Sequence, residues 1–164
     1  MTTAPPSDTL VVRYHTSFTD QEIDDFAEQL VRTGLPIALL PAGARAGVVE
    51  VLYDLSVQVG TEAMVVVAAD AAVAFWHAVT DAVRRHREAG PPVAHPPLRI
   101  ELPGPVTIVV PDDGFADTMP LLWTQVRRAS AAGTLTPGVW RWDPATQRLV
   151  AARQDPGPLP QDPG

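Results

Sequence analysis

A histidine lies between two aspartates in the middle of the chain, at spacings of seven and four residues: Asp70, His77 and Asp81. On a helix of about 3.6 residues per turn, these spacings place the three side chains on one face. A histidine beside carboxylates can bind a metal or act as an oriented general base, as in a small hydrolase or a metal-dependent enzyme. The same pattern is typical of the solvated face of an amphipathic helix, and we favour that interpretation.

One further group of polar residues is a candidate for catalysis. Asp112 and Asp113 follow an apolar run that ends at Val110, and carboxylates at strand ends can hold a metal or a substrate. The stretch Pro-Asp-Asp-Gly is also ideal for a turn, which is the interpretation that we favour. Ser7, Ser17, Ser56 and Ser130 include no G-x-S-x-G nucleophile elbow, so the sequence predicts no serine nucleophile.

Aromatic and arginine side chains alternate near the C-terminus, where Trp140 and Trp142 flank Arg141. In a strand the two indoles share one face. If they are exposed, the three residues form a candidate partner surface, because tryptophan and arginine are enriched at binding hot spots. The alternative, which we favour, is that both rings cover the end of the core.

The N-terminal third of the chain has the clearest local signals. Residues 10–14 read as a strand, and Thr19 and Glu22 have the spacing of a helix capping box. Ile23, Phe26, Ala27, Leu30 and Val31 then recur on a single helical stripe. Gly34 ends this helix, and residues 36–40 are predicted to form a buried strand.

The rest of the chain alternates between helical and extended patterns. We expect a helix at residues 48–58, where a strand is the alternative, and a long helix within 62–89. Strands at 98–102 and 106–110 are predicted to pair as a hairpin, as are 139–142 and 148–150. Between them, Asp117 or Thr118 is expected to cap a helix from about residue 120. Its inward residues would be Leu121, Leu122, Val126 and Ala129.

These elements predict one α+β domain of two layers. A small mixed sheet would pack against three to four helices, including one long helix, and the C-terminal strands would form a β-hairpin. We assign this domain to residues 9–152. Residues 1–8 and the Pro- and Gly-rich residues 153–164 are expected to be disordered.

Composition excludes several classes of function. The 164 residues contain no cysteine, which removes thiolate nucleophiles and zinc sites built on sulfur. The formal net charge of −7 argues against a nucleic-acid binder. The start lacks a signal peptide, and no stretch is long and apolar enough for a membrane span. We expect a cytoplasmic protein with no cofactor, no bound metal and no membrane or nucleic-acid partner.

The order of elements resembles the effector-associated constant component domains of actinobacterial conflict systems. The residues that carry the likeness are Gly47, the Val-rich residues 48–59, Gly60, the Ala-rich helix with Trp76, and the pair Arg84 and Arg85. The likeness covers residues 9–110, and the chain adds the helix near Pro120 and the Trp140 hairpin. The resemblance implies a small non-catalytic adaptor, encoded beside proteases or nucleotide-dependent signalling proteins. It assigns no functional residues.

Our leading hypothesis is therefore a non-catalytic protein–protein interaction module or adaptor, because no complete catalytic constellation is visible. One alternative is a small hydrolase or metal-dependent enzyme that uses the His/Asp cluster. Another is an acidic, immunity-type protein that binds a basic partner, which the net charge of −7 also suits. The partner would be another protein, and the sequence leaves homo-oligomerisation open.

Overall fold

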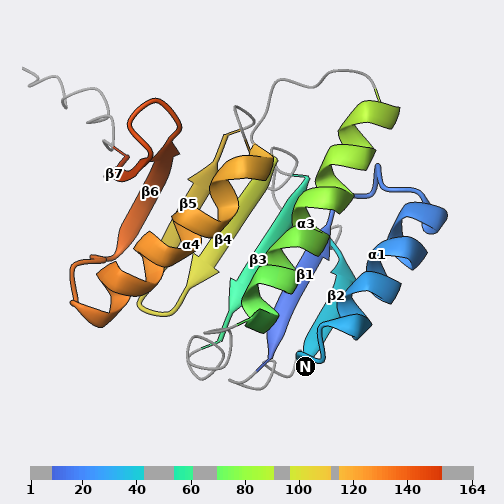
Figure 1. Ribbon diagram of the computed structural model, residues 1–164, viewed down its shortest axis with the longest axis horizontal. Coiled ribbons are helices and arrows are strands. Elements are labelled where there is room, and N and C mark those ends of the chain that lie inside the picture. The colour runs from blue at the N-terminus through green and yellow to red at the C-terminus, as the bar shows by residue number, and fades with distance from the viewer. Residues whose placement is uncertain (1–8, 43–53, 61–69, 91–96, 112–114, 153–164) are drawn as a thin grey trace, which may run out of the picture.

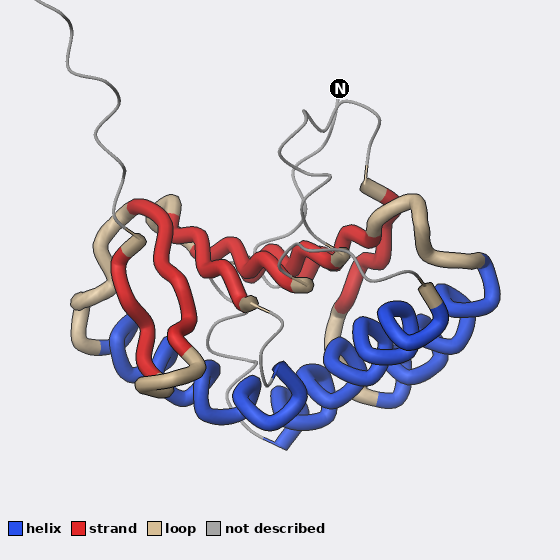
Figure 2. The backbone as a smooth tube through the Cα atoms, turned by 90° about the horizontal axis from the view of Figure 1, so that it is seen from above, coloured by secondary structure: helices blue, strands red, loops and turns tan. Residues whose placement is uncertain are grey.

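The computed structural model describes residues 9–42, 54–60, 70–90, 97–111 and 115–152. They form the strands β1 (Leu10–Tyr14), β2 (Ile37–Pro41), β3 (Leu55–Val59), β4 (Leu98–Leu102), β5 (Val106–Val110), β6 (Gly138–Asp143) and β7 (Arg148–Ala151). The helices are α1 (Asp20–Arg32), α3 (Asp70–Ala89) and α4 (Phe115–Ala131). The strands make one mixed sheet, in the order β2-β1-β3-β4-β5-β6-β7. All three helices cover the same face (Figures 1 and 2), which confirms the two-layer α+β prediction.

One connection pattern occurs three times along the sheet. Each helix joins two strands that are parallel neighbours: α1 joins β1 to β2, α3 joins β3 to β4, and α4 joins β5 to β6. The contacts between these units, β1 with β3 and β4 with β5, are antiparallel. The predicted hairpins β4–β5 and β6–β7 are confirmed. The three helices stand side by side along one layer (Figure 1), where α3 packs between α1 and α4.

The predicted capping box starts α1. Thr19 Oγ1 accepts a hydrogen bond from the Glu22 amide at 3.2 Å, and Glu22 Oε2 accepts one from the Thr19 amide at 2.8 Å. Phe26 and Leu30 are buried as the helical stripe predicts. The prediction for Val31 is wrong, because this side chain is 79% exposed. It lies beyond the width of the stripe that α1 buries against the sheet.

The strand predicted at residues 36–40 is confirmed as β2, but the prediction that it is buried is wrong. β2 lies at the edge of the sheet and leaves Leu40 exposed. Residues 55–58 of the predicted helix at 48–58 instead belong to the strand β3, which was the alternative, and Leu55, Val57 and Val59 are buried in alternation. Pairing with β1 on one side and β4 on the other decides the extended conformation, because a valine-rich run fits either period. Residues 48–53 lie outside the described residues.

The core lies between the sheet and the helices. From α3 it takes Ala72, Phe75, Trp76, Val79 and Val83, as the helical period predicts. The side chain of Val73, on the outer side of α3, is exposed.

The third helix differs from its prediction. α4 begins at Phe115, so Asp117 and Thr118 lie inside the helix and are not its cap. Leu122 and Val126 are buried as expected, but Leu121 is exposed, and the buried side of α4 is completed by Met119 and Trp123.

Candidate functional site

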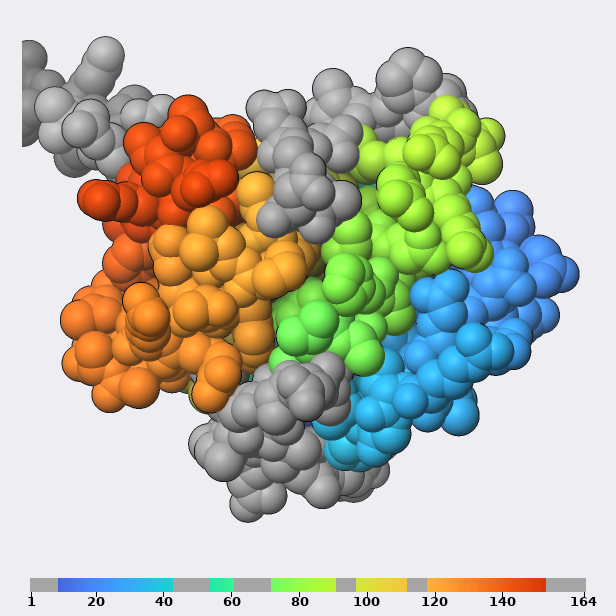
Figure 3. Space-filling model, in the orientation of Figure 1, coloured from blue at the N-terminus to red at the C-terminus, as the bar shows by residue number. Residues whose placement is uncertain are grey.

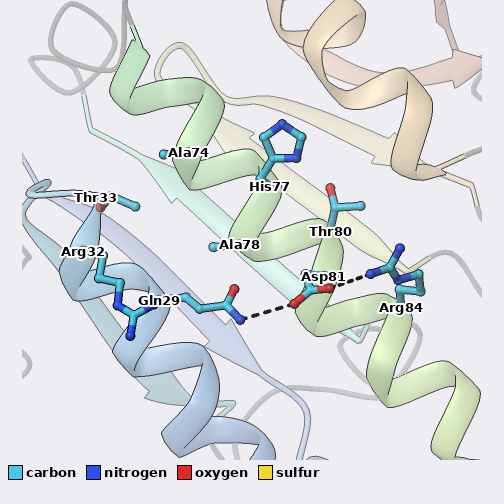
Figure 4. A pocket seen from close by; sticks show the side chains of 9 residues that line it. All are labelled: Gln29, Arg32, Thr33, Ala74, His77, Ala78, Thr80, Asp81 and Arg84. Carbon is cyan, nitrogen blue, oxygen red and sulfur yellow. Dashed lines mark hydrogen bonds and ion pairs between the residues drawn. The ribbon is translucent and has the colours of Figure 1, made fainter.

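A groove of about 590 Å³ runs between α1 and α3 on the helical side of the molecule. Figure 3 shows the surfaces of these two helices, blue and green, side by side. The lining residues are Gln29, Arg32, Thr33, Ala74, His77, Ala78, Thr80, Asp81 and Arg84 (Figure 4). Two residues of the predicted His/Asp cluster, His77 and Asp81, therefore share one groove. The side chain of the third, Asp70, lies outside the part of the chain that the structure describes.

The carboxylate of Asp81 is held by cations and an amide. Asp81 Oδ1 accepts a hydrogen bond from Arg84 at 2.6 Å. Asp81 Oδ2 lies 3.0 Å from Arg85 Nη2 and accepts a hydrogen bond from Gln29 at 3.2 Å. The interactions drawn in Figure 4 join Asp81 to Gln29 and Arg84 and leave His77 apart. Asp81 at the centre of the groove is therefore ion-paired with α3 arginines and hydrogen-bonded to α1. Its role is to hold the two helices together.

The groove offers no paired nucleophile and base among its described side chains. Thr80, its one buried hydroxyl, donates to the Trp76 carbonyl oxygen one turn earlier at 2.7 Å. Within the described residues, no group of three or more His, Asp or Glu side chains is arranged to hold a metal ion. Asp112 and Asp113 fall outside the described residues.

The two C-terminal tryptophans lie on the core side of the sheet. Trp142 is 0% exposed. Trp140 is half-buried, packs against the core, and donates its indole N–H to the Thr136 carbonyl oxygen at 3.0 Å. Arg141, between them, points to the opposite, exposed side of β6, as alternation along a strand requires. The structure therefore removes Trp142 from the candidate partner surface and leaves Arg141 on it.

The helix-free face of the sheet carries a row of arginines. The strand registers place Arg13 opposite Ser56, Ser56 opposite Arg99, Arg99 opposite Val109, Val109 opposite Arg141, and Arg141 opposite Val150. These six residues, the arginine row, cross the sheet from β1 to β7 on the side away from the helices. Strands are about 4.8 Å apart, so successive arginines in the row stand about 10 Å apart.

The described strands carry a net charge opposite in sign to that of the whole chain. The described strands hold four arginines, the three of the arginine row and Arg148, against the two carboxylates of Glu101 and Asp143. All six lie on the helix-free face, because the alternate positions of their strands face the helices. Arg99 forms an ion pair with Glu101 at 2.9 Å, and Arg13 donates to Gln58 Oε1 at 3.4 Å. Exposed Val139 and Val150 lie beside Arg141 and add apolar area.

Sequence reasoning found only one member of this row. Each of the three strands contributes a single arginine to the row, so no short stretch of sequence shows the row. The order of the strands in the sheet brings together residues that are more than a hundred positions apart. The available signal was the alternation of Arg99 with Leu98 and Ile100, which marks it as facing away from the core.

Comparison with known proteins gives no assignment: no protein-family model, curated protein or solved structure matches this chain. Among the described residues, no helix has the length and apolar character that a membrane crossing requires. The geometry of the chain itself therefore carries the functional argument.

Proposed function

We propose that this protein is a protein–protein interaction module whose contact surface is the helix-free face of the sheet. The observation that carries the proposal is the arginine row. Arginine is enriched at protein interfaces and at their hot spots, and exposed Val139 and Val150 add apolar area beside Arg141. Arginine also suits this role because its planar group binds carboxylates in a bidentate manner.

The partner that this surface fits is a protein with an acidic surface segment that also carries apolar residues. The net charge of −7 resides elsewhere on the molecule, for example on the five acidic residues of α1, while the described strands carry an excess of arginine. A negative segment is therefore attracted to the sheet face and repelled by α1. The spacing of about 10 Å between arginines equals about three residues of an extended chain.

The same face is a poor fit to nucleic acid. Sheets that bind single strands usually stack bases on exposed aromatic rings. The aromatic residues of the described strands are Tyr14, Trp140 and Trp142, and all three lie on the core side. The acidic charge of the rest of the molecule also opposes a polyanion.

This proposal agrees with the adaptor role that the resemblance to effector-associated constant component domains implies. In that role the module acts in the cytoplasm as a small non-catalytic adaptor. The proposal rests on the charged face and would stand without the resemblance.

A charge-reversal experiment tests the surface. The full chain is immobilised as wild type, as Arg13→Glu with Arg141→Glu, and as a control with Arg32→Glu and Arg128→Glu on exposed helical positions. Both double variants change the net charge by the same amount. We expect a defined protein to be captured from the source cells by the wild type and the control, and to be lost with the sheet-face variant. Capture should also weaken as salt rises.

Two results would overturn the proposal. One is equal capture by the wild type and the Arg13/Arg141 variant, which would place the contact elsewhere. The other is that nuclease treatment releases the captured material, which would make nucleic acid the ligand of this face.

A further inference from the structure

A serine, two histidines and a glutamate form a continuous chain of contacts between the start of α1 and the end of α3. Ser17 Oγ lies 2.8 Å from His15 Nδ1 and 3.0 Å from His86 Nε2. The other ring nitrogen of His86, Nδ1, lies 3.1 Å from Glu22 Oε2. The order of groups is carboxylate, imidazole, hydroxyl and second imidazole, and none of these residues belongs to the groove or to the arginine row.

Three of these four residues, His15, Glu22 and His86, are held in place by their surroundings, whereas the side chain of Ser17 is exposed. The ring of His86 stacks on Phe18 with centroids 3.8 Å apart and planes 11° apart. Glu22 is fixed by the capping box, through the bond that its Oε2 accepts from the Thr19 amide. The backbone of His15 is fixed at both ends, since its amide donates to the Asp54 carbonyl oxygen at 3.0 Å and its carbonyl accepts from the Phe18 amide at 3.1 Å.

One backbone hydrogen bond identifies the nitrogen of His15 that carries no proton. The backbone amide of Ser17 donates to His15 Nδ1 at 3.1 Å, so this nitrogen is an acceptor and carries no proton. The short contact between Ser17 Oγ and His15 Nδ1 is then a bond in which the hydroxyl donates. His86 Nδ1 donates to the Glu22 carboxylate, and His86 Nε2 donates to Ser17 Oγ when both ring nitrogens carry a proton, that is, when His86 is an imidazolium. In this arrangement the Ser17 hydroxyl donates its proton toward His15 Nδ1, and Ser17 Oγ accepts a hydrogen bond from His86 Nε2.

We infer that Ser17 is the nucleophile of an esterase-type acyl-transfer site, with His15 as the general base. His86 is the donor that stabilises negative charge on Ser17 Oγ, and Glu22 is the positioning residue that orients His86. Ser17 lies two residues before the N-cap of α1, where the helix dipole also favours negative charge. The substrate class is a small activated ester, because an exposed serine is reached directly from solvent.

The reaction balances with these groups alone. Ser17 Oγ bonds to the ester carbonyl carbon as its proton passes to His15 Nδ1, and the tetrahedral intermediate expels the alcohol, which takes that proton. Water then attacks the acyl-serine and gives a proton to His15. The Ser17–acyl bond breaks, a carboxylic acid is released, and the proton returns to Ser17 Oγ. This activity is independent of the proposed contact surface, so either proposal can fail without the other.

Covalent labelling of the full chain with a fluorophosphonate probe, followed by peptide mass mapping, tests this site. We expect the label on Ser17 and none there in Ser17→Ala. Removing the general base in His15→Gln should slow labelling by about a hundredfold or more. His86→Phe keeps a ring on Phe18 without a nitrogen, and Glu22→Gln keeps the capping box, which accepts Gln at this position. Both should label more slowly while melting near the wild-type temperature.

Matched controls separate this site from general surface reactivity. Ser130→Ala removes another exposed hydroxyl, and His77→Gln removes an exposed imidazole, so both should label at the wild-type rate. A label on residues other than Ser17 would overturn the inference. So would an unchanged rate at Ser17 in folded His15→Gln and Glu22→Gln. Hydrolysis of p-nitrophenyl acetate provides the second readout, and it should fall in Ser17→Ala and persist in His77→Gln.

Discussion

Arg87 Nε donates to Asp54 Oδ2 at 2.7 Å, and this ion pair joins the end of α3 to the residue that precedes β3. Both side chains are mostly buried, at 17% and 7% exposure. The backbone carbonyl of Asp54 also accepts the amide of His15, so the same residue anchors the loop that carries Ser17. A buried pair in this position connects α3, β3 and the β1–α1 loop.

Breaking this pair should destabilise the fold strongly. Asp54→Ala leaves a buried guanidinium without this carboxylate, and we expect a loss of about 3–5 kcal/mol in the free energy of unfolding. Glu28→Ala is the matched control, because Glu28 and Arg32 form an ion pair at 2.9 Å with exposures of 67% and 74%. That change should cost less than about 1 kcal/mol. Urea denaturation of both variants measures the difference, and equal losses would contradict the assigned role of burial.

A glycine ends α1 in a conformation that other residues rarely adopt. Gly34 has φ of 71°, and its amide donates to the Val31 carbonyl oxygen at 3.2 Å. Gly34→Ala should cost about 1–2 kcal/mol through backbone strain alone, since a Cβ there meets nothing within 4 Å. Gly90→Ala, after the end of α3, is the comparison, because Gly90 has no positive φ. Thermal unfolding should separate the two variants, and equal stability of both would contradict the strain argument.

Local patterns predicted much of the fold because local physics decides those elements. The capping box at Thr19, the alternation of Leu98, Ile100 and Leu102, and the stop at Gly34 depend on near neighbours in the chain. β3 was misassigned for a non-local reason. Its valines suit helix or strand, and the hydrogen bonds offered by β1 and β4 settle the choice.

The candidate sites depend on strand order and helix placement, which no short window contains. Ser17 and His86 are 69 positions apart and meet only because α1 and α3 pack side by side. Glu22 was identified correctly as a capping residue, and its contact with His86 is a second role that the local motif cannot reveal. The same holds for the arginine row, whose members come from β1, β4 and β6.

The four tryptophans should differ in their access to solvent. Trp76, Trp123 and Trp142 are buried, whereas Trp140 is half-buried. Acrylamide should therefore quench part of the native fluorescence. This quenchable part should be lost in Trp140→Phe and retained in Trp142→Phe. Trp142→Ala should also cost about 3–5 kcal/mol in stability, as expected for a fully buried indole. Quenching that is lost with Trp142→Phe would show that the inward orientation of this ring is wrong.

The turn between β6 and β7 holds an aspartate whose pKa is lowered. Thr146 Oγ1 donates to Asp143 Oδ2 at 2.9 Å, and the Ala145 amide donates to Oδ1 at 3.0 Å. These bonds, and the nearby charge of Arg141, stabilise the ionised form and hold the pKa of Asp143 below its ordinary value of 3.8. The stabilisation is thus fully present above pH 3.8 and is lost as the pH falls through the lowered pKa of the folded state.

Removing the hydrogen bond from the Thr146 hydroxyl should raise the pKa of Asp143. In Thr146→Val, the largest cause of the shift is gone, so the pKa of Asp143 should rise toward 3.8, as measured by NMR of its carboxyl carbon. Arg141→Gln should raise it by a smaller amount, because the charge of Arg141 is the weakest of the causes. Thr124→Val is the control, since its hydroxyl donates to the Pro120 carbonyl oxygen within α4. A larger rise with Arg141→Gln than with Thr146→Val would mean that charge, and not the hydroxyl bond, controls this carboxylate.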